Sequence, residues 1–432
     1  MGLGKTVQVL ALLEARREER AAGSLPPSLV VVPRSLVFNW LAEATQFTPA
    51  LKILDYTGAG RAAETASFAD HDVVLITYGT LRRDIATLRE RELDYVILDE
   101  AQAIKTASSQ TAQAARLLRG RHRLALSGTP VENHLDELWS LLEFLNPGFT
   151  GSEAFRKRAG DLRAPGAASA ELARALRPLI LRRTKQQVAP ELPARVEQTL
   201  VCELSARQRR LYDELRDYYR AVLEKRIGAQ GLGRTKLLVI EALLRLRQAA
   251  CHPALVDRGR QGEPCAKLDL LLPQLQEVLS EGHKVLVFSQ FTSFLALLRR
   301  RLEAEGLSYL YLDGKTRNRQ ELVEAFQSEG GCPLFLISLR AGGLGLNLTA
   351  AGYVYLLDPW WNPAVEAQAV DRAHRIGQTR TVFAYRLVAR DTVEEKILEL
   401  QAGKRALADA IIQADESLMA SLSREDLELL LS

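Results

Sequence analysis

The first six residues, M-G-L-G-K-T, carry groups that suit phosphate chemistry. Glycines such as Gly2 and Gly4 let backbone amides approach phosphate oxygens, Lys5 can reach the β and γ phosphates, and the Thr6 hydroxyl can coordinate magnesium. A G-K-T tripeptide alone is weak evidence, because it is frequent by chance. Here it starts an amphipathic segment that extends from residue 7 to about residue 20, as the second half of a phosphate-binding loop does.

Two carboxylates follow an apolar run at residues 95–98, in the sequence Asp99-Glu100-Ala101-Gln102. Parallel α/β sheets bind ligands at the carboxyl ends of their strands. Asp99 would hold magnesium there, and Glu100 would orient or deprotonate an attacking water. The alternative is a solvated acidic turn, but strand–turn–helix patterns on either side favour the catalytic interpretation.

A hydroxyl-bearing turn, Ser127-Gly128-Thr129-Pro130, joins the apolar residues 124–126 to a segment with leucines at helical spacing up to residue 145. Small hydroxyl residues at the end of a core strand suit a relay that senses phosphate. Taken alone the stretch would be a simple strand-to-helix turn. The phosphate motif before it and an arginine motif after it favour the relay.

That arginine motif is Q-A-V-D-R-A-H-R-I-G-Q at residues 368–378. Arg372 and Arg375 are three residues apart, so on a helix they would share one face. Two guanidinium groups without an acidic partner placed to neutralise both are suited to phosphate. His374 has no metal-ligand companion nearby, so a structural role is expected for it.

Composition narrows the class of protein. The 432 residues are 47% hydrophobic and 25% charged, as in soluble globular proteins, and the length suggests about three domains. The net charge of +4 does not by itself indicate nucleic-acid binding. The four cysteines lack the spacing of a metal site or disulfide framework, which fits a reducing cytoplasm, and no apolar run is long enough to span a membrane.

Apolar runs alternate with helical segments along most of the chain, which predicts an α/β fold. We expect a first lobe over residues 1–195, with a helical insertion at about 148–177. A linker and helical protrusion follow over 196–264, then a second lobe over 265–390 and a C-terminal helical brace over 391–432. Arginines in the protrusion suggest DNA contact, although such runs are usually solvated helix faces.

The order of these motifs resembles that of the Swi/Snf-type ATPases of helicase superfamily two. The resemblance rests on G-L-G-K-T, D-E-A-Q, L-S-G-T-P-V-E-N, L-R-R-T-K, R-Q-A-A-C-H-P, V-L-V-F-S-Q-F, G-G-L-G-L-N-L, D-P-W-W-N-P and D-R-A-H-R-I-G-Q, and it covers nearly the whole chain. It implies two RecA-like parallel-sheet lobes that bind ATP and Mg²⁺ and act on double-stranded DNA, mainly through phosphates. Members move along duplex DNA without separating its strands.

The resemblance also implies roles for individual residues. Lys5 and Thr6 would bind the nucleotide and its magnesium, Asp99 would be the magnesium ligand and Glu100 the hydrolytic acid. Gln102 stands where many relatives have histidine, which leaves the coupling contact at that position open, while Ser127 and Thr129 would couple nucleotide to DNA. Arg372 and Arg375 match the paired arginines, with Arg375 the better candidate for the arginine finger. Gly345 and Gln368 would line the nucleotide cleft from the second lobe.

Three functions remain open at this stage: a duplex-DNA translocase that displaces or remodels bound protein such as RNA polymerase, a strand-separating helicase, and a DNA- or partner-binding fragment without catalysis. We expect a monomeric bacterial protein in the cytoplasm, associated with the nucleoid and with no membrane. In relatives a methionine often precedes G-L-G-K-T deep inside a longer protein. We therefore expect the 432-residue chain to be a fragment without the strand that feeds the phosphate loop, poorly soluble or inactive as an ATPase by itself.

Overall fold

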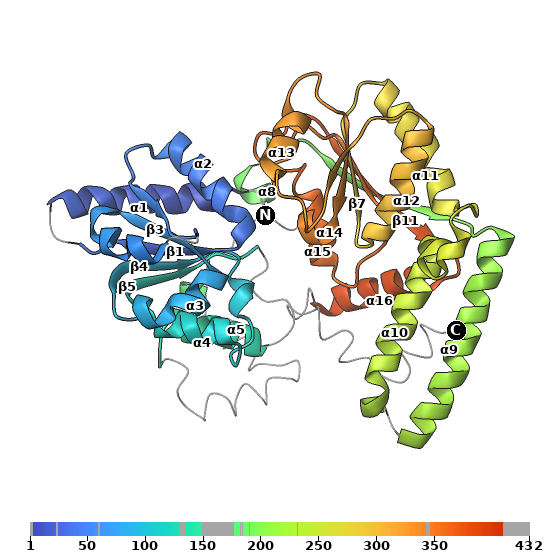
Figure 1. The fold of residues 1–432 in the computed structure, drawn as a ribbon, viewed down its shortest axis with the longest axis horizontal. Coiled ribbons are helices and arrows are strands. Elements are labelled where there is room, and N and C mark those ends of the chain that lie inside the picture. Colours follow the sequence, from blue (N-terminus) through green and yellow to red (C-terminus); the bar gives the residue numbers. More distant parts are fainter. Residues whose placement is uncertain are drawn as a thin grey trace. The chain divides into compact units, whose positions relative to one another are not determined.

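The chain folds into two compact α/β units, which we call the first lobe (residues 1–190) and the second lobe (from residue 191) (Figure 1). The computed structural model describes residues 3–22, 25–58, 61–128, 135–148, 177–181, 183, 185–189, 191–230, 232–342 and 346–408. No helix in these ranges is long and apolar enough to cross a membrane.

The first lobe is built on a five-stranded parallel sheet with the strand order β2-β3-β1-β4-β5. Its strands are β1 (Ser28–Val32), β2 (Ile53–Asp55), β3 (Val73–Thr77), β4 (Glu92–Leu98) and β5 (Arg119–Ala125). The central strands β1 and β3 are buried at every residue, as expected for a parallel sheet covered on both faces.

Helices cover both faces of this sheet. They are α1 (Lys5–Ala22), α2 (Val37–Phe47), α3 (Tyr78–Leu88), α4 (Gln110–Leu117) and α5 (Leu135–Leu145). The first unit also contains the short helix α8 (Lys185–Val188) and 3-10 helices at Arg34–Leu36, Arg61–Asp70, Ala101–Ile104 and Arg177–Leu179. Because side chains alternate along a strand, Val30 and Val32 pack under α1 and α2, whereas Leu29 and Val31 pack against α3, α4 and α5.

The second lobe contains a six-stranded parallel sheet with the order β6-β11-β10-β7-β9-β8. Its strands are β6 (Arg195–Cys202), β7 (Val285–Ser289), β8 (Leu310–Leu312), β9 (Leu334–Ser338), β10 (Tyr353–Leu356) and β11 (Val382–Ala389). The helices α11 (Ala266–Ser280) and α12 (Thr292–Ala304) cover one face. The helices α13 (Arg319–Gln327), α14 (Leu339–Gly342) and α15 (Pro363–Val370) cover the other.

Three further helices form a separate helical cluster in the second lobe. The long helices α9 (Ala206–Gln230) and α10 (Leu232–Cys251) pack side by side, and α16 (Val393–Ala408) packs against their base through Val393 and Ile397. Short 3-10 helices at Pro253–Leu255 and Arg258–Arg260 lead from α10 to α11.

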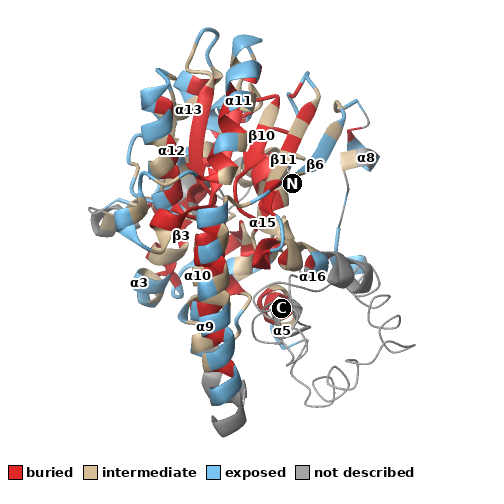
Figure 2. Ribbon diagram, turned by 90° about the vertical axis from the view of Figure 1, so that its right-hand side faces the viewer, coloured by how far each residue is buried: buried red, intermediate tan, exposed pale blue. Residues whose placement is uncertain are grey.

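The strand β6 lies in the second sheet, although we expected residues 196–204 to connect the lobes. It pairs with β11 over eight residues, from Arg195 opposite Val382 to Cys202 opposite Ala389. Much of β6 is exposed, as Figure 2 shows, because it is an edge strand. The second compact unit therefore starts at residue 191, and the helical pair α9–α10 is inserted between its first and second strands.

Candidate nucleotide site

Two of the first-lobe motifs, D-E-A-Q and the turn that begins at Ser127, meet at the carboxyl ends of neighbouring strands. Strands β4 and β5 are parallel neighbours, with Leu98 opposite Ala125, so both end at the same edge. Beyond the strands, the Leu126 amide donates to the Leu98 carbonyl and the Ala101 amide donates to the Leu126 carbonyl, each at 2.8 Å. These bonds hold the D-E-A-Q turn beside the turn that begins at Ser127.

Lys5 and Thr6 form the first turn of α1. Gly4, immediately before them, has a φ angle of +69°, a left-handed conformation that favours glycine. Burial raises the pKa of the Asp99 carboxyl, and the positive charge of Lys5 is one of the influences that oppose this rise. Gly2 lies outside the described residues.

Asp99 is only 5% exposed, and two donors hold its carboxylate. The indole Nε1 of Trp40 donates to Oδ2 at 2.9 Å, and the Glu100 amide donates to Oδ1 at 2.9 Å. Burial raises the pKa of Asp99, and the Glu100 charge adds to this effect. The Trp40 hydrogen bond and the Lys5 charge oppose it.

Glu100 is one of two non-glycine residues with a positive φ in the described part of the chain, at φ 50° and ψ 54°. A left-handed residue without glycine's freedom is strained, and such strain is found frequently at functional sites. The Nε2 atom of Gln102 donates to Oε2 of Glu100 at 2.6 Å, and Ser127 Oγ donates to Oε1 of Gln102 at 3.2 Å. Gln102 thus joins the acid to the turn after β5. Thr129 lies outside the described residues.

Sequence reasoning missed two residues that hold Asp99. Trp40 is buried in α2, and the Tyr78 hydroxyl donates to the backbone carbonyl of Asp99 at 2.7 Å. Burial raises the pKa of Tyr78, and the charges of Asp99 and Glu100 add to the rise, so it remains a neutral donor. A buried tryptophan or tyrosine usually needs a polar partner, which is the signal that could have pointed to them.

The arginine motif of the second lobe differs from our expectation. Helix α15 ends at Val370, so Arg372 and Arg375 lie in the turns that follow, and the expected shared helix face is wrong. The Leu348 amide donates a hydrogen bond to the Arg372 carbonyl, and Nε2 of Gln378 donates one to the Ala373 carbonyl. Carbonyls that would continue the helix are therefore bonded elsewhere.

Gln378 fixes the end of this segment. Its Nε2 also donates to the Thr349 and Ala351 carbonyls, and its Oε1 accepts from the Thr379 and Arg380 amides. His374 Nε2 lies 2.8 Å from the carbonyl of Pro193, which agrees with the structural role expected for it.

The candidate nucleotide residues of the second lobe differ in how exposed their side chains are. Arg372 is 7% exposed, whereas Arg375 and Gln368 are partly exposed. Asp371, the acid within the motif, pairs with Arg195 at 3.1 Å. Gly345 lies outside the described residues.

The groups near Asp99 suit magnesium. Among the described residues, no cluster of three or more histidine, cysteine, aspartate or glutamate side chains could hold a metal alone. Magnesium does not need one, because it keeps several waters and binds through one or two carboxylates together with substrate phosphates. A buried carboxylate and the hydroxyl of Thr6 on the first turn of α1 are the hard oxygen donors it prefers.

Comparison with known proteins gives the family. The model of the SNF2-related domain matches residues 1–255, and that of the helicase conserved C-terminal domain matches residues 266–377. The chain belongs to the SNF2-related family. The SNF2-related match includes the first lobe and the start of the second, and the helicase C-terminal match lies within the second lobe.

Relatives of this SNF2-related chain include bacterial proteins. It is 35% identical to an uncharacterized ATP-dependent helicase of Mycoplasma genitalium over 99% of its own length and 41% of that protein. It is 38% identical to a Bacillus subtilis protein named as a candidate ATP-dependent helicase/translocase, YwqA, over 99% of its length and 47% of that protein. The chain therefore spans less than half the length of these relatives. A solved Sulfolobus solfataricus SWI2/SNF2 ATPase core in complex with dsDNA is 35% identical over all of this chain and 91% of that one, with a TM-score of 0.48.

Proposed function

We propose that this chain hydrolyses ATP and converts the hydrolysis into movement along double-stranded DNA. The observation that carries the proposal is the side-chain connection from Glu100 through Gln102 to Ser127. It joins a strained acid beside Asp99 to a turn on the neighbouring strand. Such a connection can report the state of a bound phosphate to another part of the lobe.

Hydrolysis would use the first-lobe residues in separate roles. The first turn of α1 binds the triphosphate, with Lys5 on the β and γ phosphates. Asp99 and Thr6 would hold magnesium, which would supply positive charge against the phosphate oxygens. Glu100 accepts a proton from the attacking water, and ADP and inorganic phosphate are the products. Gln102, hydrogen-bonded to Oε2, orients the Glu100 carboxylate for that transfer.

The second lobe would complete catalysis with guanidinium groups. We assign Arg375 as the arginine finger and Arg372 as its companion, with Gly345 and Gln368 lining the nucleotide cleft. An arginine finger contributes about 10³–10⁵ in rate. Replacing Arg375 with alanine should therefore abolish turnover with little effect on folding.

Duplex DNA is the proposed track. The name of the Bacillus subtilis relative, an ATP-dependent helicase/translocase, supports this. Contacts would go mainly to phosphates, which position a protein without reading sequence. We propose that the protein acts in the cytoplasm on the nucleoid as a monomer, displacing or remodelling RNA polymerase or another DNA-bound protein.

A triplex-displacement assay tests movement without strand separation. With ATP, the protein expressed from its complete reading frame should release a triplex-forming strand from duplex DNA and leave a forked duplex paired. The Glu100→Gln variant is the control and should release neither. Efficient separation of the fork would favour a strand-separating helicase, and binding without ATP-dependent release of either substrate would favour a binding protein.

A further inference from the structure

The loop Asp358-Pro359-Trp360-Trp361-Asn362, which we call the tryptophan loop, is held by side chains from several elements of the second lobe. It leaves the carboxyl end of β10 and leads into α15, whose first turn Asn362 caps through the Ala364 amide. Asp358 is fully buried, accepts a hydrogen bond from Ser289 Oγ and lies 3.3 Å from the Gln290 amide.

Helices hold the middle of the tryptophan loop. Glu366 of α15 accepts from the Trp360 amide at 2.6 Å, and it also pairs with Arg386 of β11 at 2.7 Å. Gln401 of α16 donates to the Trp360 carbonyl. These contacts tie the loop to α15, β11 and α16, so that a shift of the loop must move α15.

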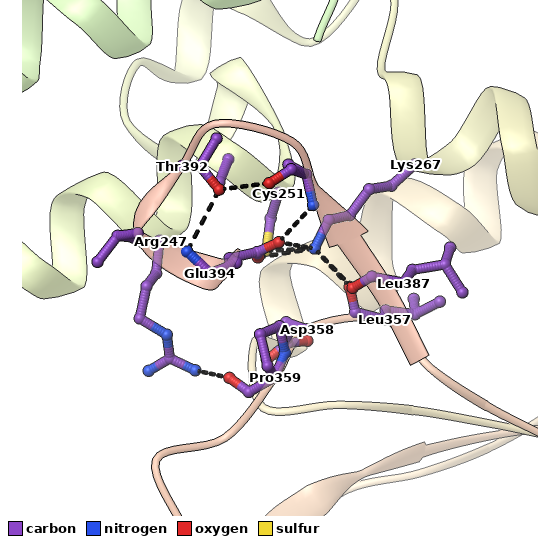
Figure 3. Close-up of polar contacts among 12 residues, drawn as sticks. Arg247, Cys251, Lys267, Leu357, Asp358, Pro359, Leu387, Thr392 and Glu394 are labelled. Atoms are coloured by element: carbon purple, nitrogen blue, oxygen red, sulfur yellow. Dashed lines mark hydrogen bonds and ion pairs between the residues drawn. The ribbon is translucent and has the colours of Figure 1, made fainter. Parts of the chain in front are cut away.

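The contact from α10 is made by Arg247, which is 3% exposed. Its guanidinium carbon lies 5.8, 5.7 and 5.6 Å from the ring centroids of Phe291, Trp360 and Trp361, respectively. Its Nη2 donates a hydrogen bond to the Pro359 carbonyl, which Figure 3 shows. Within the described residues its Nε atom has no hydrogen-bond partner.

Burying a guanidinium group in this way costs free energy, because the charged group loses its hydration by water. Burial lowers the pKa of Arg247, while the charges of Asp358, Glu394 and Glu366 oppose the change. Cation–π contacts with the three aromatic rings and the hydrogen bond to the Pro359 carbonyl offset part of this cost. A leucine or methionine would fill the space without that cost, so packing alone does not require an arginine.

The base of α10 is also fixed one turn later. Cys251 Sγ lies 3.5 Å from Glu394 of α16, and Glu394 forms a fully buried ion pair with Lys267 of α11 at 2.6 Å. Lys267 donates to the Leu357 carbonyl at 2.7 Å, immediately before the tryptophan loop. Arg247 therefore projects onto the loop from a helix whose end is anchored to the same sheet.

We propose that Arg247 is a positioning residue through which helix α10 sets the placement of α15 and of the segment that carries Arg372 and Arg375. The loop lies at one end of α15, and the two arginines follow the other end. The eight residues of α15 make a rigid rod of about 12 Å. The helical pair α9–α10 can then influence hydrolysis without touching nucleotide. The inference rests on the proposed role of these arginines in ATP hydrolysis.

Hydrogen–deuterium exchange tests the positioning without any need for activity. Arg247→Met should raise exchange across residues 357–378, and Arg247→Lys, which keeps the charge among the rings, should raise it less. Arg245→Met is the matched control, because Arg245 lies on the same helix and donates a 3.5 Å hydrogen bond to Gln248 of that helix. Exchange over 357–378 that is the same in the Arg247→Met and Arg245→Met variants would overturn the proposal. Should Arg247→Met fail to fold, Arg247→Lys decides by the same comparison.

Steady-state kinetics on the same variants tests the consequence. A displacement of about 1 Å at a catalytic group can cost about 10²-fold in rate. Arg247→Met should lower kcat to that extent and raise the KM for ATP much less, because Gln368 is the one proposed nucleotide residue on α15, whereas Lys5 and Asp99 lie in the other lobe. Unchanged kcat with raised exchange would overturn the link to the arginines. A wild-type protein without ATPase activity would refute the proposed function, while the exchange experiment would still decide the positioning.

Discussion

The Nε2 atom of Gln102 lies 2.6 Å from Oε2 of Glu100, and the other end of the same amide accepts the hydroxyl of Ser127. One neutral side chain therefore donates to the proposed hydrolytic acid and accepts from the turn after the adjacent strand. A carboxamide can do both at once because it carries a donor and an acceptor.

Gln102→Ala should separate ATP hydrolysis from its stimulation by DNA. Changes along such a coupling network alter coupling by about 0.5–2 kcal/mol, so the stimulation ratio should fall about two- to thirtyfold. The measurement is the ATPase rate with and without duplex DNA. Gln113→Ala, on α4 with a bond to the Ser108 carbonyl, is the control. A normal ratio in Gln102→Ala would remove Gln102 from the coupling path.

Trp40→Phe should weaken the use of magnesium, because it keeps an aromatic ring and removes the donor to Asp99 Oδ2. A hydrogen bond to a charged group contributes about 1.5–3 kcal/mol, so half-maximal ATPase should need about 10- to 150-fold more Mg²⁺. Calorimetric binding of ADP with Mg²⁺ gives a second readout without turnover.

Tyr78→Phe is the comparison for that experiment. It removes a donor to the backbone of Asp99 and leaves the carboxylate contacts in place. Its Mg²⁺ dependence should stay close to that of the wild type. The same shift in both variants, or none in Trp40→Phe, would show that the indole does not position the carboxylate.

Much of the fold could be predicted from sequence, because buried parallel strands are continuous apolar runs. The apolar run at residues 95–98 lies in β4, and the leucine spacing up to residue 145 lies in α5. The ends of such runs also placed Asp99 and Ser127 at strand ends. The local pattern of apolar residues was therefore sufficient to predict these elements and their ends.

Contacts between distant residues could not be predicted in this way. Trp40 bonds to a residue 59 positions away. Helix α15 ends where it does because Gln378 and Leu348 donate hydrogen bonds to the carbonyls that would continue it. Helical spacing in the sequence does not reveal these bonds. Residues 196–204 were expected to start the linker, and the pairing of β6 with β11 depends on a segment almost two hundred residues later.

The buried pair of Lys267 and Glu394 should be essential for the stability of the second lobe. Both side chains are 0% exposed, so Lys267→Met leaves an uncompensated carboxylate and should cost about 3–5 kcal/mol of unfolding free energy. The double variant Lys267→Met/Glu394→Leu should recover most of the loss, since an apolar pair of similar volume avoids the buried charge. Urea unfolding measures both.

The exposed pair of Arg301 and Asp269 is the matched control for the buried one. Its atoms are 3.6 Å apart and its side chains are 45% and 49% exposed. Arg301→Met should therefore change stability by less than about 1 kcal/mol. A loss in Lys267→Met no larger than this would mean that the buried pair contributes little.

The ATPase rate of Glu100→Gln, measured with saturating duplex DNA in the protein expressed from its complete reading frame, tests the account most directly. Glu90→Gln, an exposed glutamate paired with Arg89 before β4, is the control and should behave as wild type. Loss of a general base typically costs about 10²–10⁴-fold, so Glu100→Gln should lose turnover to that extent while it still binds ATP and DNA. Turnover within about twofold of wild type, the scatter expected of an unrelated surface change, would contradict the assignment of Glu100 as the hydrolytic acid.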